Sequence, residues 1–306
     1  MEKKKILVTG ANGQLGRELQ AIAPAFPQFD FLFYDRAALS IADPDAINTF
    51  FARERPAYCI NCAAYTAVDK AESEKESAYL INGDAVGYLA AACHNTGARL
   101  IHISTDYVFD GLSETPLRED DPTGPINTYG ASKLEGERQA LQHHPEGTLI
   151  IRTSWVYSEF GNNFVRTMIR LMKERPSINV VSDQVGSPTY AADLAAAIFH
   201  IIAATTPSSP TSPSTASTPS ATKLPFIPGL YHYSNEGRIS WYEFALAIRE
   251  DIGSTCEVHP IPTTQFPTPA KRPRFSLLDK SLIRLTYHLT IPEWRPSLVT
   301  CIAKMH

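Results

Sequence analysis

A tyrosine and a lysine four residues apart, Tyr129 and Lys133, have the types and spacing that suit proton transfer. On a helix, both side chains share one face, with Cβ atoms about 5–6 Å apart. A phenol with an ordinary pKa of about 10 is a poor acid–base catalyst, but a neighbouring ammonium favours the phenolate and lowers that pKa. Thr105, at the end of a predicted strand, offers a hydroxyl to polarise a carbonyl. The three residues predict acid–base catalysis at a carbonyl group.

Three regularly spaced glycines follow the first apolar run of the chain. Gly10, Gly13 and Gly16 form a GxxGxxG pattern between a predicted strand and a predicted helix. A side chain in such a turn would collide with the backbone or with a pyrophosphate, and the free N–H groups of a helix N-terminus attract phosphates. The pattern and its context predict a dinucleotide-binding site.

Two adjacent residues bear on the choice of dinucleotide. Asp35 ends the second predicted strand, about 20 residues after the glycines, and is placed to accept hydrogen bonds from a ribose, which favours NAD(H). Arg36 could pair with a 2′-phosphate, which favours NADP(H). The sequence therefore predicts NADPH or NADH as the cofactor and leaves the choice between them open.

These residues need a parallel sheet to bring them together. The first half of the chain alternates short apolar runs with longer amphipathic stretches, which is typical of βαβ units. Strands are predicted at 5–8, 29–34, 59–61, 100–104 and 149–152, and helices at 16–22, 43–53, 78–96 and 128–141. We predict an α/β fold, a Rossmann-type doubly wound parallel sheet with a smaller C-terminal substrate-binding domain.

The pattern of apolar and amphipathic stretches changes after residue 154, and we place the predicted domain boundary there. Residues 1–154 are predicted to form the NAD(P)-binding domain, to which later segments can return, and residues 155–306 to bind mainly the substrate. Helices are predicted at 162–175, 190–204 and 240–252, with strands at 178–181 and 229–234. A Pro/Ser/Thr-rich tract at 205–228 has few large apolar residues, so we predict a mobile surface insertion.

Composition excludes some classes of function. The formal net charge of −4 argues against a general nucleic-acid binder, and no run of about 20 apolar residues predicts a membrane span. The five cysteines are scattered, which favours a reducing, cytoplasmic setting. Cys59 and Cys62 form a CxxC, interpreted as core thiols; metal or redox use is the alternative, and no second Cys/His pair completes a site.

The motifs together resemble those of extended short-chain dehydrogenase/reductases, and within these the family of dTDP-4-dehydrorhamnose reductases. The similar stretches cover nearly the whole chain in the expected order: 8–16, 64–72, 104–111, 152–157, 161–164, 183–189 and 269–273. The resemblance implies NAD(P)H-dependent reduction of the C4 ketone of dTDP-4-dehydro-L-rhamnose. Tyr129 would donate a proton to the nascent alkoxide, supported by Lys133 and Thr105.

Site residues follow from the glycine pattern and from this resemblance. The predicted cofactor contacts are Gly10, Gly13, Gln14, Leu15, Gly16, Asp35, Arg36, Ser40, Ile41, Ala64, Tyr65, Thr66, Tyr129 and Lys133. The resemblance implies substrate contacts by Thr105, Asp106, Tyr129 and Trp155, whose indole could instead be a plain core aromatic. Candidates for binding the nucleotide diphosphate are Asn163, Arg166 and Arg272.

The resemblance has departures and competitors. Ser40 stands where the family often has an acidic residue near the adenine, and the 205–228 tract is longer than usual. Some relatives form metal-assisted dimers; no convincing cluster of Asp and Glu ligands stands out here, so we predict no metal site and leave a homodimer open. One alternative is a non-catalytic dinucleotide-binding regulatory subunit, similar to that of methionine adenosyltransferase. Another is an epimerase or dehydratase of the same superfamily.

Overall fold

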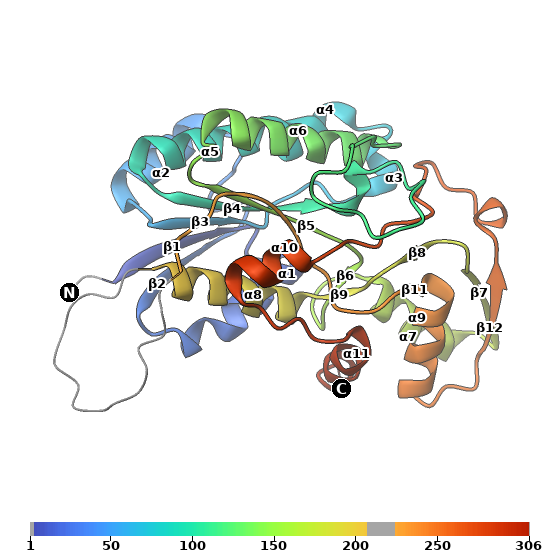
Figure 1. The fold of residues 1–306 in the computed structure, drawn as a ribbon. Coiled ribbons are helices and arrows are strands. Elements are labelled where there is room, and N and C mark those ends of the chain that lie inside the picture. Colours follow the sequence, from blue (N-terminus) through green and yellow to red (C-terminus); the bar gives the residue numbers. More distant parts are fainter. Residues whose placement is uncertain (1–2, 207–223, 306) are drawn as a thin grey trace, which may run out of the picture.

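A six-stranded parallel sheet forms the centre of the molecule, in a computed structural model that describes residues 3–206 and 224–305 (Figure 1). The order of its strands is β10-β5-β4-β3-β1-β2, and every neighbouring pair is parallel. Their bounds are β1 Lys4–Thr9, β2 Phe29–Tyr34, β3 Tyr58–Asn61, β4 Arg99–Thr105, β5 Thr148–Thr153 and β10 Gly229–His232. The predicted α/β fold with a Rossmann-type sheet is confirmed.

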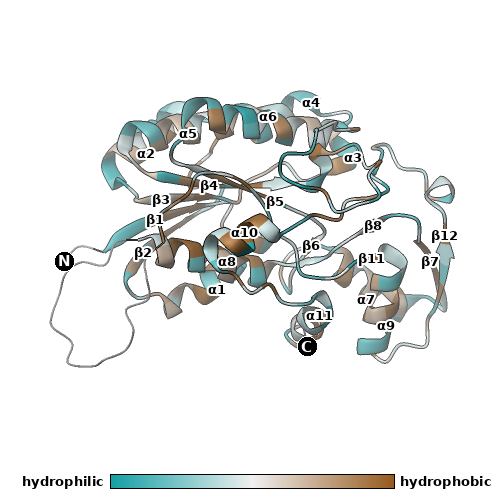
Figure 2. Cartoon of the chain, in the orientation of Figure 1, coloured by the Kyte–Doolittle hydropathy of each residue, from teal (hydrophilic) through white to brown (hydrophobic). Residues whose placement is uncertain are grey.

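Helices cover both faces of this sheet. Helices α1 (Gln14–Ile22) and α8 (Ala191–Thr205) lie on one face, and α2 (Pro44–Glu54), α5 (Ala85–Thr96) and α6 (Thr128–His143) on the other (Figure 1). Ile6 and Val8 pack into the first layer, whereas Leu7 between them packs into the second. Burial on both faces explains why the central strands are continuous apolar runs, brown in Figure 2.

The later part of the chain contributes to two units. Helix α8, strand β10 and helix α10 (Ser281–Tyr287) pack with the large sheet, while other elements build a smaller unit with its own core. Its helices are α7 Phe164–Glu174, α9 Trp241–Asp251 and α11 Trp294–Ala303. Its paired strands are β7 Ser177–Val181 with β12 Glu257–Ile261, β6 Val156–Tyr157 with β9 Thr189–Tyr190, and β8 Val185–Gly186 with β11 Ile239–Ser240.

The helix predicted at 78–96 is interrupted. Helix α4 (Lys75–Tyr79) passes through a π-helical turn at Leu80–Asp84 (η2) before α5 begins. Asn82 in this turn is fully buried; its amide accepts from Tyr65 N at 2.8 Å and donates to Tyr65 O at 3.0 Å. A π-turn aims one side chain out of the helical register, and here it aims Asn82 at the loop after β3. Short helices α3 (Val68–Ala71) and α10 (Ser281–Tyr287) were not predicted.

The tract predicted as an insertion at 205–228 is packed where it is described. Thr205 ends α8, and Leu224 N donates to Ala204 O at 3.2 Å. Leu224 and Phe226 contact the core beside the sheet. Residues 207–223 lie outside the described residues. The packed ends of the tract therefore belong to the body of the protein.

A buried carboxyl pair lies where α1 meets the smaller unit. Glu18 is 1% exposed, and Ser158 Oγ donates to its Oε1 at 2.7 Å. Neighbouring Glu159 accepts from Tyr190 Oη at 2.9 Å and lies 3.4 Å from Lys304 Nζ. Burial, then the hydrogen bond with Glu159, raises the pKa of Glu18 to about 8. Glu18 therefore holds a proton at neutral pH.

Glu18→Gln is expected to stabilise the protein at alkaline pH. In the unfolded chain Glu18 ionises near its ordinary pKa of 4.5, but in the folded protein only near 8, so its contribution to stability falls as pH rises between those values. The amide keeps a neutral polar group there, and Tm at about pH 8.5 should rise by about 2–5 °C over wild type. Calorimetry from acid to alkaline pH measures this, with exposed Glu114→Gln as control. If the Tm of Glu18→Gln depended on pH as strongly as the Tm of wild type, this prediction would be contradicted.

Candidate active site

The turn of residues 10–16, which we call the glycine cradle, begins where β1 ends. Gly10 has φ +66°, and a Cβ there would lie 2.6 Å from the backbone nitrogen of Ala63. A Cβ on Gly16 would lie 2.5 Å from the Gly10 carbonyl oxygen. Helix α1 starts directly after this turn, and no side chain caps it. The close-packed turn and the uncapped helix start together fit a pyrophosphate, because its oxygens can take the N–H groups of the first turn.

The cradle lies at the carboxyl edge of the sheet, at the point where strand order reverses. The chain runs from β1 to β2 on one side and then to β3 on the other side of β1. Ligands of open α/β sheets bind at such reversals. Asp35 follows β2, and Ala64, Tyr65 and Thr66 follow β3, so the predicted cofactor residues border the same edge.

Asp35 is held toward the cradle. Its Oδ2 accepts from Asn12 Nδ2 at 2.7 Å, and its Oδ1 accepts from the backbone nitrogens of Ala37 and Ala38, both at 3.0 Å. Arg36 beside it is exposed. Of the next predicted contacts, Ser40 is half-buried and Ile41 is buried. Asn12, inside the glycine turn, therefore orients the carboxylate that sequence reasoning assigned to the ribose.

Helix α6 presents the predicted proton-transfer residues. Tyr129 lies in its first turn and Lys133 one turn later. Lys133 is 2% exposed, and its Nζ donates to Ile103 O of β4 at 2.7 Å. The Tyr129 hydroxyl is hydrogen-bonded to Thr105, the last residue of β4. Phenol and hydroxyl thus meet at the end of β4, and the ammonium is held at Ile103, two residues earlier in the same strand.

Burial decides the protonation of this group. It raises the pKa of Tyr129 to about 12, against the lowering effect of the Thr105 hydrogen bond. The direction is opposite to the sequence-based expectation, in which a nearby ammonium lowers it. Burial also lowers the pKa of Lys133 to about 8, against the raising effect of Glu137. A phenol that keeps its proton at neutral pH suits a proton donor.

Asp106 continues the site beside Thr105. Thr105 Oγ1 donates to Asp106 Oδ1 at 3.0 Å, and both residues are buried. Burial raises the pKa of Asp106 to about 7. A half-neutralised carboxyl can accept or donate a hydrogen bond, which suits a sugar hydroxyl.

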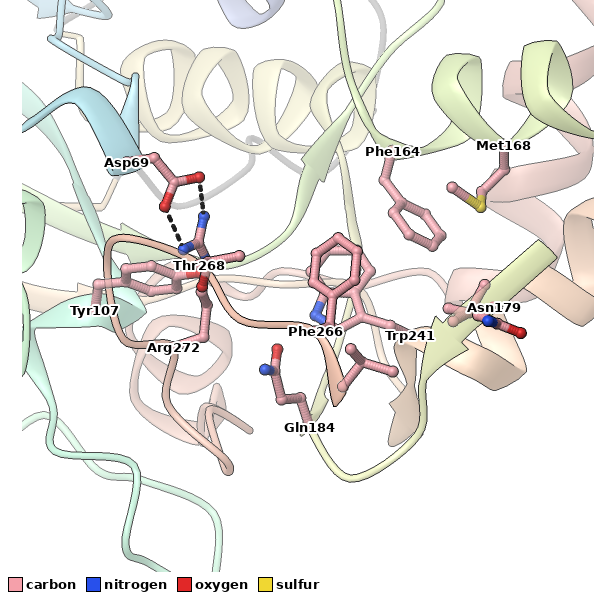
Figure 3. A pocket seen from close by; sticks show the side chains of 12 residues that line it. Asp69, Tyr107, Phe164, Met168, Asn179, Gln184, Trp241, Phe266, Thr268 and Arg272 are labelled. Carbon is pink, nitrogen blue, oxygen red and sulfur yellow. Dashed lines mark hydrogen bonds and ion pairs between the residues drawn. The ribbon is translucent and has the colours of Figure 1, made fainter. Parts of the chain in front are cut away.

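A cavity of about 350 Å³ opens beside these residues, between the large sheet and the smaller unit (Figure 3). At one end lie Asp69, Tyr107 and Arg272, and at the other a group of apolar side chains. The apolar group comprises Phe164, Met168, Val180, Val181, Trp241 and Phe266, and the lining is completed by Asn179, Gln184 and Thr268. The Tyr107 ring stands edge-on to Tyr129 at 5.7 Å, so the polar end adjoins the proton-transfer group.

Of the three residues predicted to bind a diphosphate, Arg272 lines this cavity. Its guanidinium makes two bonds to Asp69, at 2.5 and 2.8 Å.

Asn163 instead caps α7 and donates to Gln14 Oε1 at 2.9 Å. Arg166 is exposed and donates through Nε to Glu159 O at 3.0 Å. The structure thus separates Arg272 from the other two.

Trp155 has an aromatic partner that sequence reasoning missed. Its ring stacks on Trp241 with centroids 3.7 Å apart and planes 12° apart. The backbone of Trp155 is left-handed, with φ +48°. One face of the indole is therefore covered by Trp241, and Gly186 packs close to the ring, since a Cβ there would lie 3.0 Å from two of its atoms.

The predicted core thiols are free cysteines. Cys59 is buried in β3 and Cys62 partly buried after it; burial raises the pKa of the Cys62 thiol. Within the described part of the chain, no group of three or more His, Cys, Asp or Glu side chains could hold a metal. No helix among those residues is long and apolar enough to span a membrane.

The structure adds site residues that spacing did not reveal: Asn12, Asp69, Tyr107, Asn127 and Trp241. Asp69 and Tyr107 lie inside stretches that carried the family resemblance, which was the signal available for them. Asn127 precedes Tyr129 by two residues, the usual place of a helix cap. Trp241 gave no signal, because its partner is distant in sequence.

Comparison with known proteins agrees with this geometry. The family model described as RmlD substrate binding domain matches residues 4–306. A dTDP-4-dehydrorhamnose reductase from Burkholderia thailandensis is 40% identical, over 97% of this chain and 98% of its own length. The crystal structure of such a reductase from Clostridium acetobutylicum has a TM-score of 0.89 at 40% identity, covering 98% of this chain and 99% of that one.

A further relative was solved with a cofactor. The structure of a dTDP-4-dehydrorhamnose reductase from Bacillus anthracis in complex with NADP has a TM-score of 0.88 and 39% identity, covering 99% of this chain and 100% of that one. The resemblance drawn from the sequence motifs is confirmed. Because the family model spans almost every residue, the chain belongs to the RmlD substrate binding domain family.

Proposed function

We propose that this protein reduces the C4 keto group of dTDP-4-dehydro-L-rhamnose to give dTDP-L-rhamnose, with NADPH or NADH as reductant. The observation that carries the proposal is the pairing of Tyr129 with Thr105 at the end of β4, with Lys133 of the same helix held on Ile103 O of that strand. An uncapped glycine cradle lies at the same edge of the sheet. Relatives about 40% identical over nearly their full length carry the name of this activity.

The residues of the cradle and of α6 would hold the cofactor. The backbone around Gly10, Gly13 and Gly16 would take the pyrophosphate, Asp35 the adenosine ribose, and Lys133 the nicotinamide ribose. The bound, reduced nicotinamide supplies the hydride. Tyr129 donates its phenolic proton to the C4 oxygen as the ketone becomes an alcohol, and the ammonium of Lys133 stabilises the phenolate left behind.

The substrate would occupy the cavity between the two units. We infer that residues 155–306 mainly bind it, while β10 of that stretch completes the large sheet and α8 packs on its face. Thr105, Asp106 and Trp155 would contact the sugar, and Arg272 the diphosphate, since a guanidinium matches phosphate oxygens. Contacts from Asn163 and Arg166 stay predictions.

Turnover with NADPH and NADH tests the function and the cofactor together. We expect dTDP-4-dehydro-L-rhamnose to oxidise NADPH, and Arg36→Ala to raise KM for NADPH by about 10-fold while KM for NADH stays within about 2-fold, because only NADPH carries the 2′-phosphate. Equal effects on both cofactors would remove Arg36 from 2′-phosphate recognition. No turnover of any nucleotide keto-sugar would favour the regulatory-subunit alternative, and sugar isomerisation without net cofactor oxidation would favour an epimerase.

Location and assembly belong to the same proposal. We propose a cytoplasmic protein, supported by the five free cysteines. A homodimer stays a prediction, which light scattering of the purified chain tests.

A further inference from the structure

One wall of the cavity is a loop, residues 266–274, which we call the arm. Phe266, Thr268 and Arg272 of the arm line the cavity (Figure 3). The arm lies late in the chain, whereas Tyr129 and Thr105 lie in the first half. Any substrate held by the arm must therefore be brought into register with a phenol on a different structural unit.

Three consecutive arm residues are tied to the elements beside that phenol. Asp69 of α3 accepts from Ala270 N at 3.1 Å and from the guanidinium of Arg272. Between these bonds, Asn127 Nδ2 donates to Lys271 O at 2.8 Å. The middle tie is independent of Asp69, because it comes from the start of α6.

Asn127 makes a second bond with its other amide atom. Its Oδ1 accepts from Gly130 N at 2.8 Å, which caps the helix that carries Tyr129 and Lys133. The residue is 7% exposed, so these bonds do not compete with bulk water. Asp and Ser are equally good helix caps, but only an amide of this length accepts toward the helix and also donates to a carbonyl behind it.

We propose that Asn127 is a positioning residue, which registers the arm, and with it Arg272, against the helix that carries Tyr129. One planar amide fixes both ends, so a shift of the arm would break a buried hydrogen bond. Asn127 would not touch the substrate itself. The proposal rests on the proposed function, since it assigns the arm to the nucleotide-sugar and Tyr129 to its keto group.

Asn127→Asp separates the two bonds. A carboxylate still caps Gly130 N but turns an acceptor toward the Lys271 carbonyl. We expect KM for the keto-sugar to rise about 10-fold or more, with kcat within about 3-fold and NADPH affinity close to wild type. Tm should fall by a few degrees, because a buried carbonyl loses its donor. Asn127→Ser, an uncharged cap too short to reach Lys271 O, should raise KM in the same way. Asp43→Asn exchanges the cap of helix α2, away from the arm, and should change neither KM for the keto-sugar nor kcat.

The outcomes separate positioning from capping and from charge. An unchanged KM in Asn127→Asp would overturn the proposal. So would a rise in Asn127→Asp without one in Asn127→Ser, which would assign the effect to charge, or a parallel loss of NADPH affinity, which would assign it to the helix.

A second measurement stands apart from turnover. Hydrogen exchange in Asn127→Asp should be faster in the arm, including the Ala270 amide, while the amides of α6 exchange as in wild type. Unchanged exchange in the arm would also overturn the proposal. If wild type fails to reduce the keto-sugar, the proposed function falls, and the exchange result alone shows whether Asn127 holds the arm.

Discussion

Tyr129→Phe is expected to lower kcat by about 10³-fold and to leave NADPH affinity unchanged. Proton donation by a positioned side chain contributes about 10²–10⁴-fold to a rate. The phenol meets Thr105 at the end of β4, and its raised pKa keeps it protonated across the accessible pH range. The ring remains in Tyr129→Phe, so its packing against Tyr107 is preserved. Steady-state rates with NADPH and a fluorescence titration of the cofactor measure the two quantities.

Tyr107→Phe is the matched control for this variant. Tyr107 lies in the same cavity with its ring edge-on to Tyr129, but its hydroxyl is hydrogen-bonded to Arg272. Removing that hydroxyl should affect KM for the sugar more than kcat, which should stay within about 3-fold. A kcat for Tyr129→Phe equal to that of Tyr107→Phe would remove Tyr129 from proton transfer.

Local chemistry made much of the fold predictable. The apolar run at Ile6–Leu7–Val8 is typical of a strand buried on both faces, and β1 is such a strand. The glycine spacing predicted the position of the cradle, because other backbone atoms lie so close to Gly10 and Gly16 that a Cβ at either would collide with them. Both signals lie within a few residues of the structure that they specify.

Contacts between distant segments were out of reach. Arg272 and Asp69 are 203 positions apart, and the sequence around either residue does not predict a contact with the other. The same holds for Trp155 and Trp241, whose stacking covers one face of a predicted substrate contact. The π-turn at Asn82 was not predicted, because the backbone of Tyr65, to which Asn82 is hydrogen-bonded, belongs to another part of the chain.

The sign of the Tyr129 pKa shift shows the same limit. Spacing in the sequence predicts a neighbouring ammonium, and an ammonium lowers the pKa of a phenol. Burial, which spacing does not report, is the largest cause and raises the pKa of Tyr129, whereas the lowering effect comes from the Thr105 hydrogen bond and not from Lys133. The raised pKa fits reduction better, because the reaction consumes a proton from the phenol.

Lys133 should set the alkaline limit of the activity. Its pKa, lowered by burial to about 8, means that the ammonium is present below that pH and lost above it. Because the charged form stabilises the phenolate that proton donation leaves, kcat/KM should fall above about pH 8, tending to 10-fold per pH unit. Tyr129 cannot produce this limb, since its phenol titrates near 12. A pH–rate profile of wild type measures the midpoint.

Two substitutions test whether Lys133 causes this decline in activity above about pH 8. Lys133→Met keeps the length of the buried side chain without its charge and should lower kcat/KM by about 10²–10³-fold at neutral pH, with weaker NADPH binding. Lys133→Arg stays charged at every accessible pH. Its activity is lower, because a guanidinium does not fit the place of an ammonium that donates to Ile103 O at 2.7 Å, but its profile should lose the decline near pH 8. A decline that persists unchanged in Lys133→Arg would assign it to another group, since only the lysine loses its charge there.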